Sequence, residues 1–143
     1  MLMGTYEHRL DSKARLVLPA KIREKLGDVV VVTAGMDKCV SLFSEAEWIN
    51  FSANFRNVPY YSNPESRGVV RFMIGSAHEM PIDGTGRVLL PTPLRDYAGL
   101  QPGQEVVVSG VIDHVEVWNK DSWEEKRDAV VENLSELAKG MGF

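Results

Sequence analysis

The chain has little cysteine and histidine. Its 143 residues include a single cysteine, Cys39, so no intramolecular disulfide can form. Cys39 lies in the apolar run KCVSLF, which favours a buried small hydrophobe over a nucleophile. The three histidines are far apart, and none stands at a spacing typical of metal ligands. We therefore predict no metal site and no cofactor.

Long apolar runs are also lacking. No stretch has the uninterrupted apolar length that crossing a bilayer requires. The first ten residues, MLMGTYEHRL, do not follow the charged, apolar, small-residue order of a signal peptide. We expect a cytoplasmic protein without a membrane partner.

There is no overall excess of positive charge, since the formal net charge is −4. That balance argues mildly against nucleic acid as a partner, because phosphate binding usually calls for a basic surface. The charge is unevenly distributed, however, and the charged residues within 119–137 are mostly acidic. Between His8 and Leu26 only two acidic residues accompany the basic ones, which are Arg9, Lys13, Arg15, Lys21, Arg23 and Lys25.

A pattern occurs twice in the chain, as RLDSKARLVLPAKIREKL at residues 9–26 and as PIDGTGRVLLPTPLRDYA at residues 81–98. Aligning the two copies on their aspartates matches Asp11 with Asp83, Arg15 with Arg87, Pro19 with Pro91 and Gly27 with Gly99. After a short insertion around LQPGQ, the register resumes with Gly35 on Gly110, Phe43 on Trp118 and Trp48 on Trp123. The sequence therefore contains a duplicated module of about fifty residues.

Each copy predicts the same order of elements. Two β-biased runs flank a polar turn, DSKA or DGTG, and a short helix follows that begins near proline and ends at glycine. Two further strands then surround a second glycine turn, whose residues include Asp37, Lys38, Asp113 and His114. Their valine runs are too apolar for a strand with one solvated face, so they require cover on both sides.

Further helices follow each copy. Ser44 and Glu47 form a capping box, Asn63 and Pro64 begin a connecting helix with an apolar face, and Asn119 or Asp121 caps a C-terminal helix. We expect Trp48 and Trp123 to be packing anchors. The predicted division is module 1 at 5–47, a helical connection at 48–75, module 2 at 76–119 and a C-terminal helix at 120–143.

A module of this size cannot bury its valine runs on both faces alone. Either the two copies pair with each other, or the chain oligomerises. Tyr60, Tyr61 and the apolar connecting helix favour oligomerisation, which we therefore predict.

Both copies keep an aspartate and an arginine four residues apart across the first turn. Such an aspartate can accept hydrogen bonds from the amides that follow it, while the arginine pairs with it or points outward. One interpretation is a turn held by a surface ion pair; the other is a turn that aims Arg15 and Lys13 at an anion. DGTG does not match the sequence of an aspartic-protease site, and no phosphate-binding glycine loop accompanies it, so we predict no enzyme activity.

The duplicated Asp-x-x-x-Arg turns, with GSAHEMPIDGTGR joining the copies, resemble the MraZ family of bacterial transcriptional regulators. Each copy is similar to a swapped-hairpin domain of the SpoVT/AbrB kind. The resemblance implies a mostly β, α+β fold, with two tandem swapped-hairpin β-barrel modules in one pseudo-twofold unit. It also implies a nucleoid-associated ring that binds tandem G-rich direct repeats in double-stranded DNA upstream of the division and cell-wall gene cluster.

In the family, the arginine that matches Arg15 is the one tied to DNA binding, and the basic residue that matches Lys13 lies beside it. Arginine suits guanine because its planar fork can donate to both O6 and N7. We expect phosphate contacts from Lys13, Arg9, Lys21 and Arg23, although a solvated helix face explains the last two equally well. Arg87 is a further candidate for DNA contact, but it has almost nothing basic near it in sequence, so copy two is expected chiefly to maintain the module and the ring.

The first turn departs from the family pattern at one position. The family usually has glycine where this chain has Ala14, so turn 1 is expected to differ in shape if that position needs a positive φ. The alternative function is an oligomeric scaffold or protein-binding module that works through the acidic C-terminal helix, with the Asp-x-x-x-Arg turns purely structural.

Overall fold

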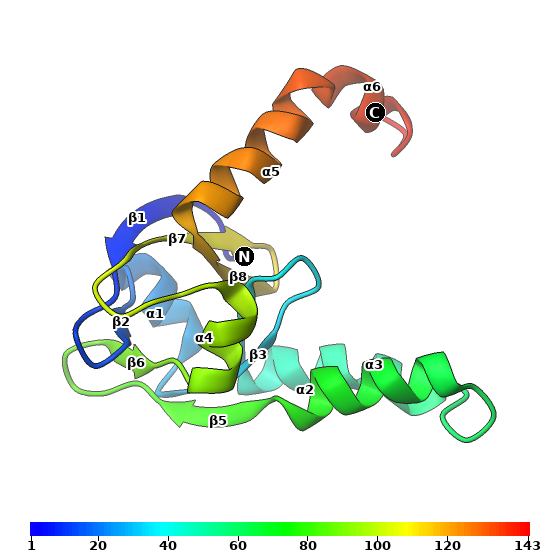
Figure 1. Ribbon diagram of the computed structural model, residues 1–143, viewed down its shortest axis with the longest axis horizontal. Helices are drawn as coiled ribbons and strands as arrows, with labels where there is room; N and C mark the ends of the chain where they lie inside the picture. Colours follow the sequence, from blue (N-terminus) through cyan, green and yellow to red (C-terminus); the bar gives the residue numbers. More distant parts are fainter.

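The computed structural model describes residues 1–143 and has a mixed α+β architecture (Figure 1). The strands are β1 (Thr5–Arg9), β2 (Arg15–Val17), β3 (Val29–Ala34), β4 (Val40–Ser44), β5 (His78–Pro81), β6 (Arg87–Leu89), β7 (Glu105–Val111) and β8 (His114–Asn119). The helices are α1 (Ala20–Leu26), α2 (Glu45–Ala53), the 3-10 helix η1 (Asn54–Asn57), α3 (Pro64–Gly75), α4 (Thr92–Ala98), α5 (Lys120–Glu132) and α6 (Leu134–Lys139). The α+β class predicted from the sequence is confirmed.

The strands form a six-stranded sheet and a separate two-stranded ribbon. The sheet has the order β1-β7-β8-β4-β3-β5, and every neighbouring pair is antiparallel. The strands β1 to β4 of the first copy correspond to β5 to β8 of the second. Exchanging each strand for its counterpart gives the same order read from the opposite edge of the sheet. The first strand of each copy lies in the other copy's half, because β1 pairs with β7 and β5 pairs with β3. The ribbon pairs β2 with β6, so it too joins the copies.

The exchange of strands covers the valine runs. Val30, Val32, Val106 and Val108 are fully buried in one core of 20 buried residues drawn from both copies. Of the two solutions that the sequence leaves open, the structure adopts the pairing of copies within one chain. The second copy supplies the cover that the valine runs require, and oligomerisation stays a prediction.

The helices α1 and α4 begin and end where the sequence predicts. Each follows a proline, Pro19 or Pro91, and each is followed by a glycine with positive φ, +87° at Gly27 and +67° at Gly99. Glycine tolerates this conformation without the Cβ clash of other residues. Both helices pack their apolar side chains into the shared core, with Ile22 and Leu26 from α1 and Leu94 and Ala98 from α4.

The elements α2, η1 and α3 form a helical arm, residues 45–75, that projects from the sheet (Figure 1). The Ser44 hydroxyl accepts the Glu47 amide at 3.2 Å, and the Asn63 side chain caps α3. At the base of α3, Met73 is buried and its carbonyl accepts the Thr33 hydroxyl at 2.6 Å. Farther out, Val69 is 50% exposed. The connecting helix is therefore packed at its base only.

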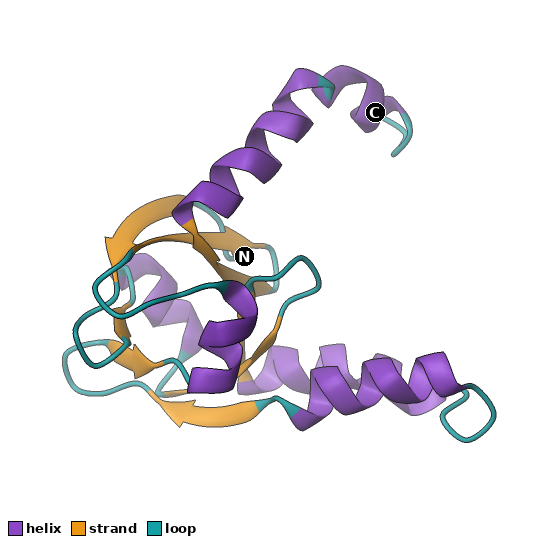
Figure 2. Ribbon diagram, viewed as in Figure 1, coloured by secondary structure: helices purple, strands orange, loops and turns teal.

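The C-terminal helices α5 and α6 leave the body in a different direction (Figure 2). Asn119 caps α5, and the Trp123 ring contacts Trp118 edge to face at a centroid distance of 6.1 Å. In the first copy, Trp48 contacts Phe43 in the same way at 5.5 Å, so both tryptophans are packing anchors as expected. The predicted single helix is interrupted at Asn133. No helix of the structure is long and apolar enough to span a bilayer.

Candidate functional site

The two Asp-x-x-x-Arg turns lie at the same end of the molecule, opposite the arm (Figure 1). Turn 1, residues 11–15, leads from β1 into β2, and turn 2, residues 83–87, leads from β5 into β6. Because β2 and β6 pair in the ribbon, the exits of both turns are joined by backbone hydrogen bonds. The pairing brings together two motifs that are 72 positions apart in the chain.

Turn 1 is closed by its aspartate. One carboxylate oxygen of Asp11 accepts the amides of Lys13 at 2.8 Å and of Arg15 at 2.9 Å. The other oxygen accepts Nε of Arg15 at 2.7 Å, while the Asp11 carbonyl accepts the Ala14 amide at 3.0 Å. The carboxylate therefore orients both the turn and the side chain of its arginine.

Turn 2 repeats this arrangement. The Asp83 carboxylate accepts the amides of Thr85 at 3.0 Å and of Arg87 at 2.9 Å, and it accepts Nε of Arg87 at 2.8 Å. It accepts one further hydrogen bond, from the Thr85 hydroxyl at 2.9 Å. The geometry thus belongs to the motif itself, since two different sequences, DSKAR and DGTGR, produce it.

These hydrogen bonds stabilise the charged form of both carboxylates. The pKa of Asp11 is lowered chiefly by the hydrogen bond from the Arg15 amide, with further contributions from the Arg15 side chain and the Lys13 amide. The pKa of Asp83 is lowered more strongly, chiefly by the Arg87 amide and also by the Thr85 hydroxyl. Both aspartates are therefore ionised at neutral pH and hold their arginines as charged partners.

Each arginine keeps its terminal nitrogens free. Only Nε of Arg15 and of Arg87 is bonded to the aspartate, and neither pair of Nη atoms has a partner in the chain. The two side chains are about one-third exposed, at 30% and 33%. Ion pairs of this exposure contribute little to stability, because water and salt screen them. Their main effect is to hold a guanidinium with its outer edge open to a ligand.

The ribbon presents both arginines on one face. Arg15 is opposite Leu89, and Arg87 is opposite Val17. The residues between them, Leu16 and Val88, are fully buried, and side chains alternate between the two faces of a strand. Arg15, Val17, Arg87 and Leu89 therefore share the outer face of the ribbon.

Turn 1 keeps the shape of turn 2 despite its alanine. Ala14 has a φ of +59°, and the matching Gly86 has a φ of +82°. A non-glycine residue in this region costs about 1–2 kcal/mol, but the Ala14 methyl is buried, which returns roughly 0.8 kcal/mol. The expectation of a differently shaped first turn is wrong, because the carboxylate hydrogen bonds and methyl burial hold alanine in the left-handed conformation.

The other basic residues are spread over the surface. Lys13 is exposed on turn 1, and its amino group has no partner. Arg9 is tied to the carbonyl of Gly103 at 2.7 Å and to Glu105 at 3.3 Å. Lys21 is exposed on α1, beside the N-terminal residues of the chain. The structure therefore gathers Lys13, Arg15 and Arg87 at one end and leaves Arg9 and Lys21 to its sides.

Arg23 lies beside turn 2, although it belongs to the first copy. Its Nη2 donates to the carbonyl of Asp83 at 3.3 Å. Arg87 has few basic neighbours in the sequence, as noted above, but in the structure Arg23 lies close to its turn, so the expectation that copy two lacks a second cation is wrong. The sequence distance of 60 residues hides the contact, and the exchange of strands between copies creates it.

Sequence reasoning missed a charged cluster at the second glycine turn of copy two. The His114 ring lies between Asp113 and Glu116, at 2.7 Å and 3.1 Å, and it stacks on Phe43. Hydrogen bonding to Glu116 raises the pKa of His114. In the repeat alignment, His114 matches the buried Cys39. This match was the one sign in the sequence that the His114 side chain packs against the body of the protein. Cys39 is buried as expected, and its burial raises the pKa of the thiol to about 12.

The fold and the site together define a class of protein. Proteins of this class contain a duplicated β module whose two copies exchange strands, with two arginines on one ribbon that are each oriented by an ion pair with an aspartate.

Comparisons with known proteins agree with this class. The family model described as "MraZ protein, putative antitoxin-like" matches residues 1–72 and again residues 73–140. The chain is 39% identical to the "Transcriptional regulator MraZ" of Thermoanaerobacter sp. (strain X514), over 96% of this chain and 94% of that one. It is 40% identical to the protein of the same name from Ligilactobacillus salivarius (strain UCC118), over 99% and 96% of the two chains. The chain belongs to the MraZ family.

Proposed function

We propose that this chain is a DNA-binding transcriptional regulator that recognises tandem G-rich direct repeats as a ring-shaped oligomer. The observation that carries the proposal is the pair of aspartate-held arginines on one face of the ribbon, with their terminal nitrogens free. The names of its relatives support regulation of transcription. The target follows from the family resemblance: repeats upstream of the bacterial division and cell-wall gene cluster, bound in the cytoplasm at the nucleoid.

The ribbon suits the major groove of DNA. That groove admits a two-stranded β-ribbon, and some DNA-binding proteins insert strands there. The two Nη atoms of Arg15 can donate to O6 and N7 of guanine, a contact worth about 1–3 kcal/mol of discrimination. Because Asp11 already orients the guanidinium, less rotamer freedom is lost when the contact forms.

Phosphate contacts would set the register of the protein on DNA. Lys13 is the first candidate, since it is exposed beside Arg15 and its amino group is free. The further candidates are Arg9 at the end of β1, Arg23 against turn 2, and Lys21, which is exposed on α1. Such contacts carry no sequence information but make affinity fall as salt rises.

Assembly would compensate for the net negative charge of −4. Several subunits that meet several repeats gain from effective concentration without any new kind of contact. The arm and the C-terminal helices provide apolar surface that assembly could cover, including Ile49 at 68% exposed and Tyr61 at 92% exposed. Light scattering at micromolar concentration tests the ring, and a monomer would contradict it.

We also propose that the chain divides as its repeat suggests. Residues 5–47 and 76–119 are the two modules, residues 48–75 are the helical connection, and residues 120–143 are the C-terminal helical segment with α5 and α6. The two separate matches of the family model support a boundary in the connection.

A mobility-shift titration against tandem G-rich repeats tests the DNA-binding proposal. Wild type should bind the repeats more tightly than a shuffled duplex of equal composition, and Arg15→Ala should weaken binding roughly tenfold or more. Arg127→Ala is the matched control, because Arg127 is an exposed arginine paired with an aspartate on α5. The proposal is wrong if wild type ignores the repeats or if Arg15→Ala binds as tightly as wild type.

A second candidate is a protein-binding module that works through the C-terminal helix. It is favoured by the exposed apolar side chains of α5 and α6, which have no partner in the chain: Val130, Val131, Leu134 and Leu137. The double variant Leu134→Glu/Leu137→Glu separates the two candidates. The regulator proposal expects unchanged affinity for a single repeat, whereas the scaffold proposal expects no DNA binding by wild type and loss of assembly in the variant.

A further inference from the structure

We propose that Arg23, on α1 of the first copy, is a positioning residue for Arg87 in the second copy. This inference rests on the proposed DNA-binding function and goes beyond it, because it assigns Arg23 to one particular turn. In sequence, Arg23 and Arg87 are 64 positions apart. In the structure, the guanidinium of Arg23 lies against the turn that orients Arg87.

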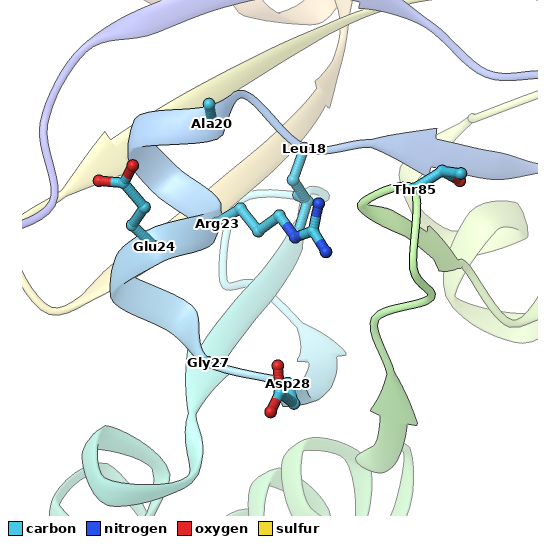
Figure 3. A pocket seen from close by; sticks show the side chains of 7 residues that line it. All are labelled: Leu18, Ala20, Arg23, Glu24, Gly27, Asp28 and Thr85. Atoms are coloured by element: carbon cyan, nitrogen blue, oxygen red, sulfur yellow. The ribbon is translucent and has the colours of Figure 1, made fainter.

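The contact involves the backbone of turn 2. Nη2 of Arg23 donates to the Asp83 carbonyl at 3.3 Å. A Cβ placed on Gly86 would lie 3.0 Å from Nη1 of Arg23 and 3.3 Å from its Cδ. The arginine therefore occupies the space that the missing side chain of Gly86 leaves open. Figure 3 shows Arg23 extending from α1 toward the loop that carries Thr85.

The backbone of α1, from which the Arg23 side chain extends, is fixed relative to turn 2. The Leu18 amide donates to the Gly86 carbonyl at 2.9 Å, just before α1 begins. Ile22 and Leu26 anchor the helix in the core. No carboxylate lies within salt-bridge distance of Arg23, so the hydrogen bond of its guanidinium goes to turn 2. A surface hollow of about 510 Å³ lies beside the contact, lined by Leu18, Ala20, Arg23, Glu24, Gly27, Asp28 and Thr85 (Figure 3).

The repeat partner of Arg23 behaves differently. Arg95 on α4 donates through Nε to the Leu90 carbonyl at 3.0 Å and through Nη2 to the Thr92 hydroxyl at 2.9 Å. It makes no hydrogen bond to turn 1. The position in turn 1 that matches Gly86 is Ala14, whose methyl is buried. Turn 1 therefore has a buried methyl where turn 2 has glycine, and the arginine that matches Arg23 bonds within its own copy instead of reaching the turn.

The consequence passes through Asp83. Its carbonyl accepts both the Gly86 amide and Arg23, while its carboxylate holds Nε of Arg87. Loss of Arg23 would loosen the backbone of the residue that orients Arg87. Turn 1 has no such dependence, because its arginine is oriented by contacts within turn 1 alone.

A double-mutant cycle on DNA tests this role. Arg23→Ala should weaken binding to the G-rich repeats roughly threefold to tenfold in the wild-type background, and by less than about twofold in an Arg87→Ala background. With Arg15→Ala its effect should be additive. Arg95→Ala is the matched control and should not couple to Arg87. Equal effects of Arg23→Ala in the wild-type and Arg87→Ala backgrounds would overturn the proposal.

The conservative variant and a measurement without DNA complete the test. Arg23→Lys keeps the charge but loses the planar fork of the guanidinium. It should recover less than half of the DNA-binding energy that Arg23→Ala loses. Full recovery would mean that Arg23 makes a phosphate contact only, and it would overturn the positioning role. Hydrogen exchange of the Thr85 and Arg87 amides should quicken in Arg23→Ala, while exchange in turn 1 stays unchanged. If wild type binds no DNA, the proposed function fails, and the exchange rates still decide whether Arg23 holds turn 2. Unchanged exchange there would overturn the proposal.

Discussion

Turn 1 and turn 2 have nearly the same internal hydrogen bonds and very different surroundings. In both, an aspartate accepts two amides and the Nε of an arginine four residues later. Turn 1 carries its own second cation, the free Lys13. Turn 2 obtains one from the other copy, Arg23, and lies beside a hollow that Glu24 and Asp28 also line. The motif determines local geometry, whereas the opposite copy determines the electrostatic environment.

This difference bears on the work of the two turns. Exposed carboxylates beside turn 2 disfavour a nearby phosphate, and its cation is engaged with a carbonyl. In turn 1, the amino group of Lys13 has no partner in the chain. Turn 1 therefore remains the proposed principal DNA-reading element. The basic residues around it in the sequence and the free amino group of Lys13 in the structure both favour this assignment.

The largest expected effect separates the two arginines. Arg15→Ala should weaken binding to tandem G-rich repeats by roughly 10- to 100-fold, and Arg87→Ala by no more than about tenfold. Each loses one guanidinium held by an aspartate, so the two variants are matched in chemistry. Mobility-shift titrations at one fixed salt concentration measure both. The reverse order would assign the principal role to turn 2.

The left-handed positions should respond unequally to exchange of their residues. Gly86→Ala should destabilise the protein by about 1–2 kcal/mol, because φ is +82° and the new methyl would press on Arg23. Ala14→Gly should stay within about 0.5 kcal/mol of wild type, since relief of backbone strain is offset by the lost methyl and a more flexible unfolded chain. Urea unfolding measures both, and a neutral Gly86→Ala would contradict the backbone strain expected at this φ.

The two aspartates should titrate differently. Both pKa values lie below the ordinary value of 3.8, and that of Asp83 is lowered further. The stability that each carboxylate contributes is present above its unfolded pKa, and it is lost as pH falls toward the lowered folded value. Thr85→Val should raise the pKa of Asp83 and leave Asp11 unchanged, as followed by NMR of the carboxyl carbons. Thr85→Ser keeps the hydroxyl and serves as control; a pKa of Asp83 that stays unchanged in Thr85→Val would contradict the assignment.

The smallest expected effect concerns the matched positions of Cys39 and His114. The raised pKa of His114 means that its contribution is complete below the unfolded value near 6.5 and is lost as pH rises through the folded pKa. The stability difference between wild type and His114→Gln should therefore shrink as pH rises above about 6.5. Cys39→Ala should show no such trend, because the thiol pKa of about 12 keeps Cys39 neutral over this range. Denaturant titrations at several pH values compare the two variants, and a stability difference for His114→Gln that stays constant with pH would contradict the ion-paired histidine.

Much of the fold follows from local signals in the sequence. Pro19 and Gly27 bound α1 because proline suits the start of a helix and glycine its end, and Asn63 and Asn119 cap their helices by short-range hydrogen bonds. The aspartate geometry of both turns is local in the same way. These features involve residues within about four positions of one another, which is why a single sequence reveals them.

Other features depend on contacts between the copies. The valine runs require cover, but they do not say whether a second copy or a second chain supplies it. Arg23 reaches turn 2 only because the strands are exchanged. Ala14 is tolerated only because its turn is held by Asp11, and the outer part of α3 stays exposed although its pattern is apolar. Such outcomes follow from tertiary packing, which local propensity does not encode.

The exchange of strands makes the sequence repeat a poor unit of folding. A fragment that ends in the arm would have β3 without β5, and it would lose β7, the only partner of β1. Its valines would face solvent and its edges would be free to pair with other chains. Two complementary fragments, cut at the tip of the arm, could still regain every strand pairing by recombining. The duplicated chain thus resembles a dimer whose two subunits are covalently joined, and neither half can complete its strand pairing without the other.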